Sequence, residues 1–161
     1  MSSREAEIAE IAQKTTPNLW CDTEADEAAH HCASLFEDSR VVRVLRCTEA
    51  GPGESGTVVA VQFELAGQRF VGINGGPLFR FTEAVSLEVR CAAQEEVDRL
   101  REQLGEGGEH GPCGWVADRC GLSWQVVPNR LHELITDPDE AKVARVTKAV
   151  LGTGKLEAAA G

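Results

Sequence analysis

With 161 residues, 42% of them apolar, the chain is long enough to bury one hydrophobic core, so composition predicts a single globular domain. Its 16 Lys and Arg against 26 Asp and Glu give a formal net charge of −10, which disfavours nucleic acid and anionic membrane surfaces as partners. Because no stretch approaches the roughly 20 apolar residues that span a bilayer, and residues 1–14 lack the apolar core of a secretory signal, we expect a cytoplasmic protein.

The first half of the chain predicts the order strand, helix, strand, strand, strand. A polar extension over residues 1–14 comes first, and its part 4–14 suits either a short peripheral helix or a frayed end. Residues 24–36 carry small and apolar side chains at helical spacing, and Ala66-Gly67 is a two-residue hairpin signal. The strands are expected over residues 16–21, 40–47, 56–65 and 68–74.

The same order restarts after the Gly-Pro loop that begins at Gly75. We expect a strand over 84–91, a helix over 94–104, a glycine-rich turn over 105–111 and strands over 113–117 and 122–127, with one strand of this module brief or irregular. Two helices over 131–136 and 139–151 and a loose tail complete the chain.

The internal repeat is the strongest architectural signal in the sequence. Gly67-Gln68-Arg69-Phe70 aligns with Gly121-Leu122-Ser123-Trp124, so a glycine turn and an aromatic strand opening coincide in the two halves. The fold prediction is therefore α+β, with two βαβββ modules over about 15–76 and 83–128 that form a curved mixed sheet around a cleft. C-terminal helices over about 129–151 finish a domain of residues 15–152, between the extension 1–14 and a tail 153–161.

Several sequence blocks in a fixed order resemble a known family. They include Thr16-Pro17-Asn18-Leu19-Trp20, Gly67-Gln68-Arg69-Phe70, Asn74-Gly75-Gly76-Pro77, Gly111-Pro112-Cys113-Gly114-Trp115 and Gly121-Leu122-Ser123-Trp124-Gln125. Over roughly residues 15–150 the chain resembles the PhnB-like branch of the vicinal oxygen chelate (glyoxalase/bleomycin-resistance) superfamily, often labelled 3-demethylubiquinone-9 3-methyltransferase-like. The resemblance implies a ligand cleft and a homodimer, but it leaves the chemistry open because one fold hosts many activities.

Metal-using relatives in that superfamily hold a divalent ion with His and Glu side chains from the first and last strands of each module. At these positions the chain offers Thr16, Asn18, Trp20, Gly72, Ile73, Asn74, Ala84, Ser86 and Gln125, and none is a good ligand. His110, Cys113 and Cys120 match no zinc-ligand spacing, and we expect the six dispersed cysteines to stay reduced. We therefore expect no metal and no cofactor.

Methyl transfer is also disfavoured by the sequence. A methyl donor such as S-adenosylmethionine usually lies on a glycine-rich turn between a strand and a helix. The glycine-rich segment Gly72-Ile73-Asn74-Gly75-Gly76 leads into Pro77 and Phe79 and not into a helix, so a plain loop explains it.

Aromatic and polar side chains along the expected strands suit a flat or apolar ligand, although core packing explains each aromatic residue taken singly. The candidate ligand-binding residues are Asn18, Trp20, Asn74, Phe79, Ser86, Glu88, Trp115, Trp124 and Gln125. We expect a metal-independent small-molecule-binding protein that sequesters, or gives self-resistance to, an aromatic metabolite. The alternatives are a metal-dependent lyase, isomerase or dioxygenase of the same superfamily, and an interaction module whose dimer surface is its function.

Overall fold

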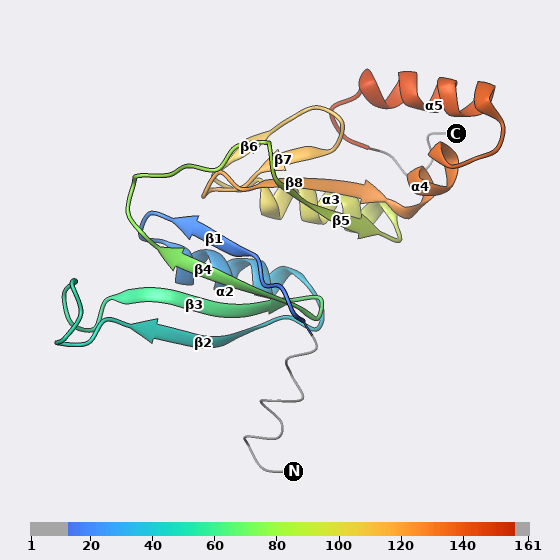
Figure 1. Cartoon of the computed structure of the whole chain (residues 1–161). Helices are drawn as coiled ribbons and strands as arrows, with labels where there is room; N and C mark the ends of the chain where they lie inside the picture. Colours follow the sequence, from blue (N-terminus) through green and yellow to red (C-terminus); the bar gives the residue numbers. More distant parts are fainter. Residues whose placement is uncertain (1–12, 157–161) are drawn as a thin grey trace, which may run out of the picture. The chain divides into compact units, whose positions relative to one another are not determined.

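The structure, a computed structural model, describes residues 13–156, so most of the helix expected over 4–14 lies outside the described residues. The chain divides into two compact units, unit 1 over Met1–Arg80 and unit 2 over Phe81–Gly161. Each unit holds one four-stranded sheet, with the strand orders β1-β4-β3-β2 and β5-β8-β7-β6 (Figure 1). The predicted α+β fold of two βαβββ modules is confirmed.

Unit 1 consists of β1 (Asn18–Cys21), α2 (Ala25–Leu35), β2 (Arg40–Arg46), β3 (Val58–Leu65) and β4 (Gln68–Asn74). Strand β1 runs parallel to β4, and β2, β3 and β4 are antiparallel neighbours. The β3–β4 hairpin turns at Ala66 and Gly67, whose φ angles of 48° and 81° both lie in the left-handed region. A tight two-residue hairpin needs this conformation, which explains the glycine.

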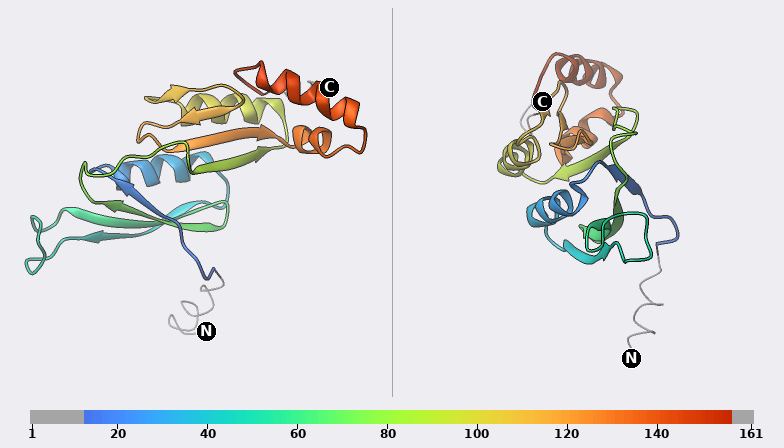
Figure 2. Two further views of the ribbon diagram at one scale, coloured as in Figure 1. Left: turned by 45° about the horizontal axis from the view of Figure 1, so that its top comes forward. Right: turned by 90° about the vertical axis from the view of Figure 1, so that its left-hand side faces the viewer.

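Helix α2 covers one face of the unit 1 sheet (Figure 2). Its buried side is built from small residues, since Ala25 and Ala29 are 2% and 1% exposed. Gly72 of β4 lies beneath it, and a Cβ there would lie 3.2 Å from the Cβ of Ala25. The helix can therefore pack close to the sheet only because both surfaces carry small residues.

Unit 2 repeats the order with β5 (Ser86–Cys91), α3 (Gln94–Leu104), β6 (Glu109–His110), β7 (Trp115–Ala117) and β8 (Ser123–Pro128). The brief strand that the sequence leaves unplaced is β6, which has two residues and lies within the expected turn over 105–111. Helix α3 buries Val97, Leu100 and Leu104 at 0%, 0% and 1% exposure. These side chains and the apolar face of β8 form the core of this unit.

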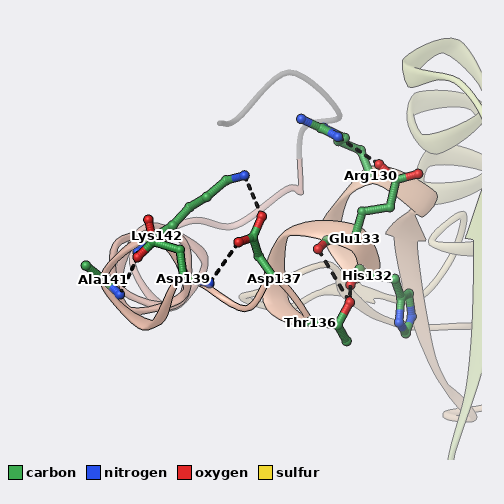
Figure 3. A network of polar contacts seen from close by, with 8 residues as sticks. All are labelled: Arg130, His132, Glu133, Thr136, Asp137, Asp139, Ala141 and Lys142. Carbon is green, nitrogen blue, oxygen red and sulfur yellow. Dashed lines mark hydrogen bonds and ion pairs between the residues drawn. The ribbon is translucent and has the colours of Figure 1, made fainter.

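Two further helices, α4 (Asn129–Ile135) and α5 (Glu140–Leu151), follow β8 directly. Polar contacts hold the turn between them (Figure 3): the Lys142 ammonium pairs with Asp137 at 2.6 Å, and Asp139 caps α5 by accepting from the amides of Ala141 and Lys142. Over residues 13–156, no helix combines the length and apolar character needed to cross a membrane.

The segment after α5, over residues 153–156, is anchored on unit 2; of the loose tail that the sequence predicts over 156–161, only Leu156 is described. The Cys113 amide donates to the Thr153 carbonyl at 2.8 Å, and the Gly114 amide donates to the Gly154 carbonyl at 2.8 Å. Leu156 is only 4% exposed. Burial of one leucine and two backbone hydrogen bonds anchor this segment on unit 2; residues 157–161 lie outside the described part.

Candidate functional site

Each sheet has one face covered by its own helix, α2 or α3, and we call the opposite one its distal face. Side chains alternate between the two faces along a strand, and paired residues on neighbouring strands share a face. In unit 2, Glu88 of β5 pairs with Gln125 of β8, which pairs with Trp115 of β7. These three side chains form one row on the distal face, since Trp124 and Val126 on either side of Gln125 belong to the core.

Two polar pairs lie on this distal face. The Gln125 amide donates to the Ser86 hydroxyl at 2.8 Å, and His132 Nε2 lies 2.6 Å from the Glu88 carboxylate. Four of the predicted ligand-binding residues, Ser86, Glu88, Trp115 and Gln125, are thus brought together on one surface. The arrangement offers a flat indole next to an amide, a hydroxyl and a carboxylate, which can bind an aromatic molecule that carries polar substituents.

Sequence patterns did not indicate two residues that contact members of this group, His132 on the distal face and Arg101 on the helix-covered side. His132 comes from α4, and its only sequence signal is that α4 follows β8, the parallel neighbour of β5. Arg101 of α3 donates to the carbonyls of Trp115 at 3.2 Å and Gly111 at 3.1 Å. It therefore fixes the turn that leads into β7 and positions the backbone of Trp115, which no sequence spacing reveals.

In unit 1 the distal face carries an apolar row that crosses all four strands: Leu45, Ala60, Ile73 and Trp20. The Trp20 indole donates to the Gly76 carbonyl at 2.9 Å and meets the Phe79 ring edge to face, with centroids 4.9 Å apart. A Cβ on Gly75 would collide with this indole. The predicted residues Trp20 and Phe79 therefore form an aromatic pair.

Polar residues extend the distal face of unit 1 along the strands. Asn18 lies on this face two residues before Trp20, and its amide donates to the Thr16 carbonyl at 2.9 Å. Further along, Glu64 pairs with Arg69 at 2.9 Å and with Arg40 at 3.2 Å. The hydrogen bond from Arg69, followed by the bond and charge of Arg40, lowers the pKa of Glu64 below its usual 4.5. The carboxylate is therefore held in its charged form.

Two predicted ligand-binding residues lie on the helix-covered faces instead. Asn74 accepts from the Ala25 amide at 2.8 Å and donates to the Val58 carbonyl at 3.1 Å, so it holds the start of α2. Trp124 is 2% exposed, and its indole donates to Asp118 at 2.9 Å. Each residue lies one position along its strand from a residue of the distal face, so its side chain points to the helix-covered face. There Asn74 holds the start of α2, and Trp124 packs in the core.

The donor set does not fit a metal centre. Across residues 13–156, no three His, Cys, Asp or Glu side chains lie where they could hold one ion. Glu88 and His132 supply only two donors, and Gln125 beside them is a neutral amide. The Cys113 thiol donates to the Val150 carbonyl at 3.1 Å, and His110 contacts the Arg101 carbonyl at 3.1 Å.

The cysteine side chains take no part in the distal faces. No disulfide joins any of the six, all of which lie in the described part. Burial raises the pKa of the Cys91 thiol to about 12, with a further contribution from the charge of Glu96. Cys91 is therefore a packing residue and cannot act as a nucleophile near neutral pH.

Comparison with known proteins identifies relatives over most of the chain. The sequence model of the family described as 3-demethylubiquinone-9 3-methyltransferase matches residues 13–127. No curated protein matches the sequence significantly. A PhnB protein from Bacillus cereus, described as a 3-demethylubiquinone-9 3-methyltransferase, has a solved structure with 37% identity and a TM-score of 0.64, covering 72% of this chain and 99% of its own.

Two more distant structures show likeness in fold. Protein PA1353 from Pseudomonas aeruginosa is 18% identical, with a TM-score of 0.56, and the match covers 71% of this chain and 96% of that one. The fosfomycin resistance protein FosX from Listeria monocytogenes, solved with Mn(II) and sulfate, is 14% identical, with a TM-score of 0.49 and coverage of 75% and 93%. The second likeness is too weak to transfer a metal or a ligand to this chain.

Proposed function

Since the chain belongs to the 3-demethylubiquinone-9 3-methyltransferase family, the PhnB-like branch of the vicinal oxygen chelate superfamily, we propose that it binds a small aromatic molecule without a metal. The role that fits this activity is sequestration of, or self-resistance to, an aromatic metabolite. The observation that supports the proposal best is the row of Glu88, Gln125 and Trp115 on the distal face of unit 2.

The polar pairs on this face are arranged for hydrogen bonding to a ligand. Ser86 accepts its bond from Gln125, so its own hydroxyl proton is available to an oxygen or nitrogen of the ligand. Glu88, paired with His132, adds carboxylate oxygens that can accept hydrogen bonds from a ligand. Trp115 supplies the apolar surface on which an aromatic ring can stack.

Methyl transfer does not fit the chain, although the family description names it. A site for a methyl donor usually has a helix directly after a glycine-rich strand end, so that the helix N-terminus faces the ligand. In this chain Gly75 and Gly76 follow β4, and residues 75–85 contain no helix. Gly75 instead makes room for the Trp20 indole.

The second candidate function is a metal-dependent lyase, isomerase or dioxygenase with an unorthodox ligand set. The specific observation in its favour is the contact of 2.6 Å between Glu88 and His132, because carboxylate and imidazole are both metal donors. An ion at this point would need a third donor, and within residues 13–156 no further His, Cys, Asp or Glu lies where it could complete such a group with this pair.

Elemental analysis of the purified, untagged protein separates these two functions. We expect less than a tenth of an equivalent of divalent metal, and calorimetric screening of the chelator-treated protein should still find aromatic ligands. Gln125→Leu should weaken their binding about tenfold or more, since it removes the amide that contacts Ser86. Gln68→Leu, an exposed control in unit 1, should leave binding unchanged. Stoichiometric metal, with binding that depends on it, would refute the metal-independent function.

We further propose that the protein is a cytoplasmic homodimer. The apolar row on the distal face of unit 1 supports the dimer, since Leu45 in this row is 39% exposed on a sheet surface. Sedimentation equilibrium at micromolar concentration should give twice the monomer mass of 17.3 kDa. A single monomeric species would refute the dimer without affecting the ligand-binding proposal.

A further inference from the structure

Unit 2 contains a pocket of about 170 Å³ that is separate from its distal face. Its walls come from the end of β8, from α4 and α5, and from the segment that follows α5. All of its lining residues lie beyond residue 127, where the family match ends. The lining includes none of the residues assigned to ligand binding on the distal faces, so it constitutes a second candidate site.

The side chains around the pocket are almost entirely aliphatic: Leu131, Leu134, Val146, Ala149, Val150 and Leu156. Pro128 and two polar side chains, Thr153 and Lys155, complete the lining. The Thr153 hydroxyl donates to the Lys155 carbonyl at 2.8 Å, and the Lys155 ammonium pairs with Asp98 at 2.8 Å. A charged ligand would therefore find no unsatisfied opposite charge here and would lose its hydration.

The walls of the pocket are held by polar contacts, which explains why they do not close on one another. The backbone bonds from Cys113 and Gly114 fix the segment after α5, and the Cys113 thiol donates to the last turn of α5 at the Val150 carbonyl. At the other end of α5, Asp139 and the Lys142–Asp137 pair fix its start against α4 (Figure 3).

We propose that this pocket binds a small uncharged apolar molecule of about the size of one benzene ring. The pocket is partly open to solvent, with Ala149 exposed at its rim, and its volume of about 170 Å³ and aliphatic lining suit a ligand of this class. Binding here is independent of the function proposed for the distal faces, because the two surfaces share no residue. The extension after β8 thus gives this chain a second small-molecule site.

The test uses the full chain with ¹³C-labelled leucine and valine methyl groups, titrated with benzene. We expect saturable ring-current shifts in the methyl groups that line the pocket. Ala149→Leu places a larger side chain in the pocket and should abolish these shifts. Ala144→Leu, the same change at an exposed position on α5 outside the lining, should leave them intact.

Saturable shifts that are lost in Ala149→Leu and kept in Ala144→Leu would support the proposal. Absence of saturable shifts in the unaltered chain, or shifts that persist in Ala149→Leu, would overturn it.

If Ala149→Leu loses its dispersed methyl spectrum, Val146→Ala replaces it, since it enlarges the pocket and should change benzene affinity by at least about threefold. An unchanged affinity in that variant would equally overturn the proposal. Failure here leaves the Trp115 surface untouched, so it is distinguishable from failure of the proposed function.

Discussion

Asp118 offers the sharpest test of why Trp124 belongs to the core and not to a ligand site. This carboxylate is 9% exposed and accepts three hydrogen bonds within its own turn and strand. One oxygen accepts from the amides of Cys120 at 2.9 Å and Leu122 at 3.1 Å, and the other accepts from the Trp124 indole at 2.9 Å. Both oxygens are needed, so an amide cannot replace the carboxylate.

Asp118→Asn should therefore destabilise the protein although it changes only one atom. Asparagine can present its oxygen to the two backbone amides, but its NH₂ then faces the Trp124 indole N–H, donor against donor. Leaving one buried donor unsatisfied costs about 1–3 kcal/mol. With a urea m-value of about 1–3 kcal/mol/M, the unfolding midpoint should fall by roughly 1 M.

Asp139→Asn is the matched control for this prediction. At the start of α5 a single Asp139 oxygen accepts both amide bonds, and asparagine caps helices about as well as aspartate. Urea unfolding of Asp139→Asn, followed by tryptophan fluorescence and far-UV dichroism, should give a free energy of unfolding within about 0.5 kcal/mol of the unaltered protein. Equal stability of Asp118→Asn and Asp139→Asn would refute the reasoning that the Asp118 contacts hold Trp124 in the core.

Three further predictions concern the two units separately. Glu64→Gln should lower the free energy of unfolding by about 1 kcal/mol near pH 7. Because the pKa of Glu64 in the folded state lies below its unfolded value of 4.5, the ion pair stabilises the protein above about pH 4.5. In denaturant titrations, the difference in unfolding free energy between the variant and the unaltered protein should vanish as the pH falls through the folded-state pKa. Gly75→Ala should lower the melting temperature by creating a collision with Trp20, at about 1–3 kcal/mol; an unchanged melting temperature would argue against the Trp20 position. Thiol labelling of the native chain, read by mass spectrometry, should modify the half-buried Cys113 and Cys120 well before Cys91; early reaction of Cys91 would contradict its burial.

The element order was predictable from sequence because local signals are strong. Apolar residues at helical spacing indicated α2 and α3, and Ala66-Gly67 indicated the β3–β4 hairpin with its left-handed turn. The brief strand expected in the second module could not be placed at β6, because glycines surround these two residues and a strand of that length has no periodicity. The anchoring of Leu156 was missed because it depends on backbone bonds to Cys113 and Gly114, far away in the sequence.

The candidate site was only partly predictable, because the sequence does not show which face of the sheet each strand residue points to. Sequence indicates which residues lie on strands, but the face of each residue depends on register and on which side the helix packs. Asn74 and Trp124 were therefore grouped with the ligand-binding residues, although they face the helices. His132 could not be found at all, since its contact with Glu88 joins α4 to a strand 44 residues earlier.

Indole N–H resonances give the most direct test of ligand binding on the distal faces. The chain has three tryptophans, which the structure assigns to the distal face of unit 1, the distal face of unit 2 and the core. In a titration of the chelator-treated, ¹⁵N-labelled protein with aromatic ligands from the calorimetric screen, we predict saturable shifts of the Trp115 resonance and little change at Trp124. Shifts confined to Trp124, or none at Trp115 at saturation, would contradict the assignment of the ligand to the row of Glu88, Gln125 and Trp115.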